Sequence, residues 1–454
     1  MKIINPANAE MITEIEEDNS SSLNVKFEKL QDAQSQWASA GIDFRVSVIK
    51  RFAELLGEQT EELAMVLTSE VGKPLQQSRN EINGGRNRIK WLCEHAAKYL
   101  ADEIMTNSGG LEERISYEPL GVICNISAWN YPYLVGINVF VPALLAGNTV
   151  MYKPSEYASL TGLQIQRVLT EAGLPKHVFE IAVGGQAVGE RLLDMNFDGY
   201  YFTGSYKTGK YIYERVASKM VPCQLELGGK DPLYVADDIE DIRSIAAATA
   251  DGAFYNNGQS CCAVERIYVH EKVYDSYVDE FIKEVKSFKT GDPKDDGVYI
   301  AALTRKQQIA LLTDQVEEAI IKGATLAVGG KAIKRDGNYF EPTVLLNVSN
   351  NMQVMQEESF GPIIGIMKVK DDTEAIAMMQ DTQYGLTASV YSSSKERAEK
   401  ILKQVDVGTG YWNCCDRVSA AVPWSGRKNS GFGSTLSHMG IRAFAKVKAW
   451  QMKN

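Results

Sequence analysis

The feature that most limits the possible folds is an alternation that begins after Pro119. From there, short apolar runs that end in a glycine or a polar turn alternate with segments long enough to form a helix. The runs cover residues 121–126, 149–152, 178–183, 199–202 and 223–227. Strands separated by helix-length segments are typical of βαβ units, in which the strands are parallel. The chain is therefore predicted to be an α/β protein, with its active groups in the loops at the carboxyl ends of these strands.

The segments on either side of this region carry other patterns. Helices are predicted after a serine cap at 20–22 and over 45–70 and 76–100, and strands at 113–118 and 442–452. The strand at 113–118 is expected in a separate small sheet. A second α/β region covers about 228–430. No repeat or low-complexity linker separates these parts, so we expect domains that are interwoven along the chain.

Charge and composition exclude several classes of protein. Among 454 residues, 48 basic and 58 acidic side chains leave a net charge of −10, which repels nucleic-acid phosphates. The hydrophobic share of 44% and the charged share of 23% are those of a globular protein rather than a disordered one. The longest apolar stretch, 134–152, contains Asn138, Pro142 and Gly147 and is not expected to cross a bilayer as one helix. Neither nucleic acid nor a membrane is an expected partner.

The cysteines and histidines argue against a disulfide framework or a metal site. The seven cysteines are odd in number and lack C-x-x-C spacing, and no two of the four histidines are spaced to share a metal. The first residues show no signal-peptide pattern. We therefore expect a reducing, cytoplasmic location and no metal.

Cys261 is the first candidate for chemistry. It follows Asn257-Gly258-Gln259-Ser260, where the glycine allows a close turn, and a helix beginning beyond it would lower the pKa of the thiol. Most cysteines are small, buried, apolar side chains without a catalytic role. The residues around Cys261 do not by themselves exclude this structural role for it. Cys262 is the adjacent alternative and is expected to be the more buried of the two.

Two polar residues that follow predicted strands are the next candidates. Glu226 ends the run 223–227 against Gly228 and Gly229, where a carboxylate could act as a general base for water. Asn130 follows the run 121–126 in a tight loop, where its amide could donate to a developing oxyanion. An exposed loop acid and ordinary turn chemistry are the alternatives.

Two further turns could hold a dinucleotide. The segment 202–209 passes from a strand through Gly204 to a helix start, so its amides could meet a pyrophosphate, although it is not a G-x-G-x-x-G fingerprint. Glu156 follows Lys153 at the end of another strand, where an acid accepts hydrogen bonds from ribose hydroxyls and repels a 2′-phosphate. A Ser-Glu helix cap is the alternative for this turn. The candidates together supply a thiol, a base, an oxyanion donor and a cofactor cradle.

These motifs resemble those of the NAD(P)-dependent aldehyde dehydrogenase superfamily, in the family's order and over nearly the whole chain. The matching segments begin at Trp129, Lys153, Phe202, Glu226, Gly258, Glu357 and Pro423. The resemblance implies a doubly wound parallel-sheet nucleotide domain, an α/β catalytic domain and a small oligomerisation β-sheet. The implied bounds are 1–101 and 120–227 for the NAD-binding domain, 228–430 for the catalytic domain, and 102–119 with 431–454 for the oligomerisation sheet and tail. A homodimer or a homotetramer is the expected assembly.

The resemblance also implies roles for single residues. Cys261 would be the nucleophile, Glu226 the general base, and Asn130 the oxyanion donor together with the Cys261 amide. Lys153 would be a further catalytic residue. Together with Glu156, it would also hold the adenosine ribose of the cofactor. The remaining residues expected at the cofactor are Trp129, Gly185, Gly204, Ser205, Leu227, Glu358 and Phe360. The implied reaction is oxidation of an aldehyde to the acid through a thiohemiacetal and a thioester, without transfer to coenzyme A.

The substrate is predicted from six pocket residues. They are Tyr131, Asn138, Tyr255, Cys262, Val418 and Trp424. Relatives that take succinate semialdehyde tend to carry arginine at the positions of Asn138 and Tyr255, so the sequence favours a neutral aliphatic or aromatic aldehyde. Arg417 leaves a carboxylate-bearing substrate of the succinate-semialdehyde type as the alternative. Glu156 favours NAD over NADP.

A cysteine hydrolase and a scaffold protein of the same fold are the two alternatives to an aldehyde dehydrogenase. A cysteine hydrolase needs an imidazole beside the thiol, and only His270 is near Cys261 in the sequence. A scaffold protein of the same fold would show damage to the thiol, acid and amide, and here all three are intact.

Overall fold

A computed structural model describes residues 1–453, and its centre is a six-stranded sheet. The strand order is β19-β9-β8-β5-β6-β7. The parallel strands are β5 (Val122–Ile126), β6 (Thr149–Lys153), β7 (Phe179–Ile181), β8 (Gly199–Thr203) and β9 (Cys223–Glu226). Each coincides with a predicted strand. The chain runs outward from β5 to β7 and returns to β8 beside β5, so the strand order reverses between β5 and β8, where ligands of such sheets bind.

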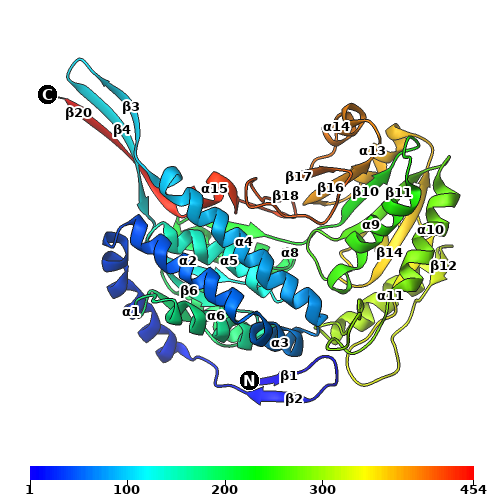
Figure 1. The fold of residues 1–454 in the computed structure, drawn as a ribbon, viewed down its shortest axis with the longest axis horizontal. Helices are drawn as coiled ribbons and strands as arrows, with labels where there is room; N and C mark the ends of the chain where they lie inside the picture. Colours follow the sequence, from blue (N-terminus) through cyan, green and yellow to red (C-terminus); the bar gives the residue numbers. More distant parts are fainter. Residues whose placement is uncertain (454) are drawn as a thin grey trace.

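Helices cover both faces of this sheet (Figure 1). They are α1 (Ser20–Ser39), α2 (Ile42–Glu58), α3 (Thr60–Val71), α4 (Leu75–Leu100), α5 (Pro132–Leu145), α6 (Ser159–Glu171), α7 (Gln186–Asp194) and α8 (Tyr206–Val216). The long helix α4 packs against α2, α3 and α5. One buried core, which includes Trp37, Phe52 and Phe140, joins these helices to the sheet.

Two details of the predicted helices are wrong. The segment 45–70 is not one helix, because the chain breaks at Gln59 (φ −107°, ψ 15°) between α2 and α3. Both helices bury their apolar faces against α4, so the hydrophobic period continues across the break and hides it. The cap of α1 is Asn19, whose side chain accepts from the Ser22 N–H while Ser22 Oγ accepts from the Asn19 N–H.

The second α/β region forms a seven-stranded sheet at the other end of the molecule (Figure 1). Its strands, in spatial order, are β12 (Thr325–Val328), β13 (Thr343–Leu346), β14 (Ile363–Val369), β11 (Val264–His270), β10 (Asp231–Val235), β16 (Thr387–Tyr391) and β17 (Thr409–Trp412). Its helices are α9 (Ile242–Phe254), α10 (Tyr274–Ser287), α11 (Gln307–Ile321), α13 (Asp372–Gln380) and α14 (Lys395–Leu402). The chain passes from the first sheet into the second between β9 and β10.

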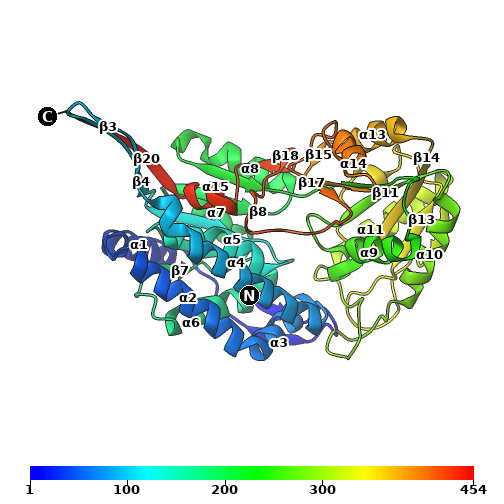
Figure 2. The same cartoon turned by 45° about the horizontal axis from the view of Figure 1, so that its top comes forward.

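A three-stranded antiparallel sheet projects from the body (Figures 1 and 2). It consists of β3 (Glu103–Ser108), β4 (Leu111–Pro119) and β20 (Ala445–Lys453). Its apolar side chains Ile104, Met105 and Val447 are more than half exposed. Such an isolated sheet is marginal in water unless another surface covers it.

The residues before β20 divide between other parts of the fold. Residues Ser437–Arg442 form helix α15, which packs on α4, so the last strand begins at Ala445 rather than at Arg442. The short strand β19 (Gly431–Phe432) pairs with β9 and extends the six-stranded sheet. Within residues 1–453, no helix combines the length and the apolar character that a bilayer span requires.

Candidate active site

The predicted catalytic residues lie at the carboxyl ends of neighbouring strands. Glu226 is the last residue of β9 and Lys153 the last residue of β6. Asn130 lies in the loop between β5 and α5, and Ser205 caps α8 directly after β8. Because β5, β6, β8 and β9 are parallel, these four ends share one edge of the sheet.

Cys261 reaches this edge from the seven-stranded sheet. The turn before it holds Asn256 and Asn257 in the left-handed region (φ 54° and 56°). Gly258 has φ 69°, and a Cβ there would lie 2.2 Å from the carbonyl oxygen of Gly361, so the close approach of two backbones requires glycine. The expected helix beyond Cys261 is wrong. Strand β11 begins at Val264 and is buried between β10 and β14.

The loop that carries Asn130 is held by a buried network. Asn130 Nδ2 donates to the carbonyl oxygen of Gln259 at 3.1 Å, and this carbonyl also accepts from Asn256 Nδ2 at 3.0 Å. The carbonyl of Asn130 itself accepts from Asn256 Nδ2 at 3.1 Å and from Lys73 Nζ at 2.8 Å. These bonds tie the Asn130 amide to the turn that precedes Cys261.

Lys73 belongs to a buried ion pair that the sequence did not reveal. It pairs with Glu81, and both side chains are 1% exposed or less. Glu81 in turn accepts the Tyr133 N–H at 2.9 Å, at the start of α5. Lys73 also lies over the ring of Tyr131, 3.9 Å from its centroid. The pair therefore supports the Asn130 loop through both Asn130 and Tyr133. The sequence did not mark it, because Lys73 lies in the turn between α3 and α4 and Glu81 lies within α4.

Glu226 is buried and its carboxyl is easily protonated. Burial raises the pKa of Glu226 to about 7, while the hydroxyl of Thr435 and the charge of Arg88 act in the opposite direction. Thr435 Oγ1 donates to the Glu226 carboxylate, and Gln224 Nε2 lies 3.5 Å from it. A carboxyl with this pKa can accept a proton from water near neutral pH and release it again.

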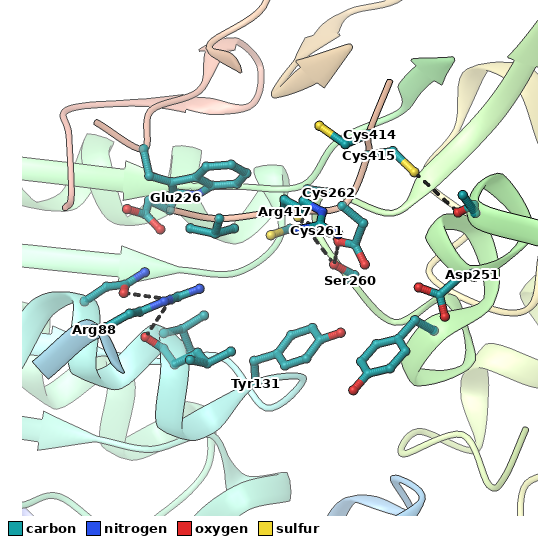
Figure 3. A pocket seen from close by; sticks show the side chains of 18 of the residues that line it. Arg88, Tyr131, Glu226, Asp251, Ser260, Cys261, Cys262, Cys414, Cys415 and Arg417 are labelled. Atoms are coloured by element: carbon teal, nitrogen blue, oxygen red, sulfur yellow. Dashed lines mark hydrogen bonds between the residues drawn. The ribbon is translucent and has the colours of Figure 1, made fainter. Parts of the chain in front are cut away.

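The site is a chain of three cavities. A cavity of about 410 Å³ is lined by all six residues predicted for the substrate pocket, together with Glu226, Cys261 and the unexpected Arg88 (Figure 3). A second cavity, of about 180 Å³, is lined by the predicted Trp129, Leu227, Glu358 and Phe360. A third, of about 490 Å³, is lined by the predicted Lys153, Glu156 and Gly185. Gly204 and Ser205 line both the second and the third cavity. Cys261 and Glu226 line both the first and the second.

Comparison with known proteins agrees with this arrangement. The model of the aldehyde dehydrogenase family matches residues 1–450. Aminoaldehyde dehydrogenase 2 of Zea mays is 33% identical over 460 residues, which cover 99% of this chain and 91% of that protein. Succinate-semialdehyde dehydrogenase [NADP(+)] of Deinococcus radiodurans is 31% identical over 98% of this chain and 93% of its own length. The P. syringae AldA indole-3-acetaldehyde dehydrogenase, solved with NAD+ and IAA, superposes with a TM-score of 0.97 at 30% identity, covering 100% of this chain and 93% of that one.

The chain belongs to the aldehyde dehydrogenase family. It has the family's fold, and the doubly wound α/β architecture inferred from the sequence is confirmed. Members of this family with similar structures bind NAD or NADP. Similar proteins include aminoaldehyde, betaine aldehyde and succinate-semialdehyde dehydrogenases, so membership of the family leaves the substrate of this chain open.

The two adjacent cysteines, Cys261 and Cys262, differ in their surroundings. Cys262 is buried and its Sγ donates to Asp416 Oδ1 at 3.0 Å, where Ser260 Oγ also donates at 3.0 Å. Contact with Cys261, burial and the charge of Asp416 raise the pKa of Cys262 well above its ordinary value. Cys261 is less buried than Cys262. Of these two cysteines, only Cys261 lines both the first and the second cavity.

The second cavity is bounded by an anchored loop. Glu265 accepts the N–H groups of Ser359 and Phe360 at 2.8 and 3.0 Å and forms a buried pair with Lys230 at 2.6 Å. Phe360 (φ 47°) packs edge-on against Trp129, with ring centroids 5.3 Å apart. Glu358 accepts the Gly229 N–H at 3.1 Å, and burial raises its pKa to about 8. These contacts form the wall of the second cavity next to Cys261.

Two arginines in the site were not found from the sequence. Arg88 of α4 lines the first cavity, and Arg305, just before α11, lines the second and third. The Nε atom of Arg305 is buried without a hydrogen-bond partner. Neither arginine forms an ion pair with any residue in 1–453. Arg88 lies on a helix, where charged residues are typical of solvent-facing positions, and Arg305 lies in a loop, so neither one stands out in the sequence.

Proposed function

We propose that this protein oxidises an aldehyde to the carboxylic acid with NAD, using Cys261 as the nucleophile. The observation that carries the proposal is that Cys261 and Glu226 line both the substrate cavity and the adjoining cofactor-side cavity. A covalent adduct on this sulfur is therefore accessible from one side to an aldehyde and from the other to a cofactor. No histidine lines the substrate cavity, which supports this reaction over a cysteine hydrolase.

The first step follows from the groups around Cys261. Its thiolate adds to the carbonyl carbon, and the new alkoxide accepts hydrogen bonds from Asn130 Nδ2 and from the backbone N–H of Cys261. Asn130 uses one amide hydrogen on Gln259 and has a second for this purpose. The product is a tetrahedral thiohemiacetal on Cys261. Loss of its hydride turns it into a thioester.

The second step depends on Glu226. In its charged form it removes a proton from water, the hydroxide adds to the thioester carbon, and the carbon–sulfur bond breaks to release the acid and restore the thiolate. Since its pKa is about 7, both proton acceptance and proton release occur near neutral pH. A base of this kind favours hydrolysis over transfer to coenzyme A.

The second and third cavities fit a nicotinamide dinucleotide, whose nicotinamide accepts the hydride when it is bound. The buried, unpartnered Nε of Arg305 lies between the two cavities and suits a pyrophosphate, as do the first amides of α8 at Ser205. Glu156 is exposed on the wall of the third cavity, where a ribose diol would be accepted and a 2′-phosphate repelled. Glu156 thus supports NAD over NADP, and relative turnover with the two cofactors tests this choice.

We further propose an oligomeric state and a cellular compartment for the protein. The projecting sheet of β3, β4 and β20 exposes apolar side chains and suits contact with a second copy, in a homodimer or a homotetramer. We place the protein in the cytoplasm. The division into an NAD-binding, a catalytic and an oligomerisation part follows the three sheets, with β19 joined to the first of them.

The formation of NADH on addition of an aldehyde tests the reaction. We expect Cys261→Ala to abolish this absorbance change, because no other thiol lines both cavities. Cys262→Ala is the matched control and should retain turnover. Activity in Cys261→Ala together with its loss in Cys262→Ala would move the nucleophile to position 262. Hydrolysis of an ester without any NADH formation would favour the hydrolase.

A further inference from the structure

The substrate cavity holds a guanidinium that forms no ion pair with the described residues. Arg88 Nη1 donates to Asn138 Oδ1 at 2.8 Å and to the Leu134 carbonyl at 3.4 Å, and both acceptors are neutral. Its Nε and Nη2 make no hydrogen bond within residues 1–453. No carboxylate among these residues lies within 4.0 Å of the guanidinium. Burial lowers the pKa of Arg88, because it removes water from the charged group, and the charges of Cys262, Glu226 and Glu81 act in the opposite direction.

Of the other buried cations near the site, Lys73 and Lys230 form ion pairs, whereas Lys153, on the wall of the third cavity, and Arg266, bonded to backbone carbonyls, do not. Lys73 has Glu81, and Lys230 has Glu265 at 2.6 Å. Placing a cation in a protein cavity without a counter-charge carries a free-energy cost, which an anionic ligand removes. Arg88 therefore differs from Lys73 and Lys230 in a way that points to a bound anion.

The geometry of Arg88 suits a carboxylate in this cavity. Two contacts of Nη1 to α5 hold the guanidinium, and Nε and Nη2 are the pair of donors that bind a carboxylate through both its oxygens. Figure 3 shows Arg88 and Glu226 entering from the same side of the view, with Cys261 near its centre. Arg417 also lines the cavity but is exposed.

The position of Arg88 changes the prediction of the substrate. A neutral aldehyde was expected because positions 138 and 255 carry asparagine and tyrosine. Arg88 belongs to another helix, yet its guanidinium is bound to the side chain of Asn138. The positive charge expected of a semialdehyde pocket is therefore present at this place, supplied from α4 instead of α5.

We propose that Arg88 binds a carboxylate of the substrate, so that the preferred substrates are short aldehydes with an acid group at the opposite end. This inference rests on the proposed aldehyde oxidation and specifies its substrate class. Arg88 also acts on Glu226, because its charge lowers the pKa of that carboxyl. This electrostatic effect would be the same for every aldehyde, whereas carboxylate binding separates charged substrates from neutral ones.

The main test compares two series of aldehydes of equal length. One is the half-aldehydes of the four-, five- and six-carbon dicarboxylic acids, and the other is the unbranched neutral aldehydes. We expect the wild type to prefer one acidic aldehyde, and Arg88→Gln to lower its kcat/KM by about 100-fold, mainly through KM, with at most a few-fold change for the neutral series. Arg88→Lys should recover part of the loss. Equal losses in both series, or no acidic preference in the wild type, would overturn the proposal.

A matched variant and a binding measurement complete the design. Arg86→Gln removes a guanidinium from the same helix outside the cavity, where Arg86 donates to the Ala53 carbonyl at 3.1 Å, and it should leave the acidic preference unchanged.

Calorimetric binding of glutarate to Cys261→Ala needs no turnover. Binding that Arg88→Gln abolishes supports the carboxylate site even if no aldehyde is oxidised. Binding that Arg88→Gln leaves intact contradicts it, even in an active dehydrogenase. Unchanged NADH affinity in Arg88→Gln shows that the variant is folded.

Discussion

The cavities on the two sides of Cys261 are built in different ways. On the cofactor side, many of the wall residues belong to short segments at strand ends, such as 153–156 and 202–205. On the substrate side, separate side chains of α4, α5 and α9 meet the segments 260–262 and 413–418, which come from two different loops. Chemistry and cofactor binding therefore depend on local sequence, and substrate choice depends on how distant elements pack.

The largest effect is expected where the two cavities meet. Glu226→Gln keeps the shape but removes the base, so turnover should fall by about 10³-fold while the first NADH equivalent still forms as a burst. In the wild type, kcat should rise with pH through about 7, because burial raises the pKa of Glu226 to that value and only the charged form accepts a proton. Stopped-flow absorbance and a pH profile check both points. Loss of the burst along with turnover would place Glu226 before thioester formation.

A second prediction concerns the support of the Asn130 loop, which serves both cavities. Lys73→Met leaves the buried Glu81 unpaired and should lower the free energy of unfolding by about 3–5 kcal/mol. It also removes the bond to the Asn130 carbonyl, so kcat should fall by about 10- to 100-fold. The double variant Lys73→Met with Glu81→Leu, compared by denaturant unfolding and kinetics, should recover stability more than kcat. Full recovery of kcat would reduce the pair to a structural role.

The third prediction tests the cofactor side alone. Arg305→Gln should weaken NADH binding by about tenfold and make it less sensitive to salt, with little change in the KM for the aldehyde. Fluorescence titration at two ionic strengths measures both effects. Lys306→Gln, the exposed neighbour, is the control and should bind NADH as the wild type does. An unaltered salt dependence in Arg305→Gln would exclude contact with the pyrophosphate.

The smallest effect is expected at the exposed end of the cofactor cleft. Glu156→Gln should raise turnover with NADP a few-fold relative to NAD, since it removes a charge that repels a 2′-phosphate but adds no cation to bind one. Competition between the two cofactors is the measurement. A wild type that already prefers NADP would make the NAD assignment wrong.

The same contrast explains which parts of the fold were predictable. The strands from β5 to β9 were found because each is a buried apolar run that ends in a turn, and this pattern is local. The break at Gln59 was hidden because α2 and α3 bury the same face on α4. The helix expected after Cys261 is absent because the segment from Val264 pairs with strands on both sides, and this pairing is invisible to local propensity.

Within the site, the sequence by itself determined the reactive groups, since a thiol, an acid and an amide must each follow a strand or a tight turn to be useful, and such positions are marked by adjacent residues. Only the tertiary structure decided that Arg88 stands beside Asn138 without a counter-ion and that Lys73 and Glu81 hold the Asn130 loop. The physical reason is that the free energy of a buried charge depends on the groups packed around it. Here those groups come from helices and turns far apart along the chain.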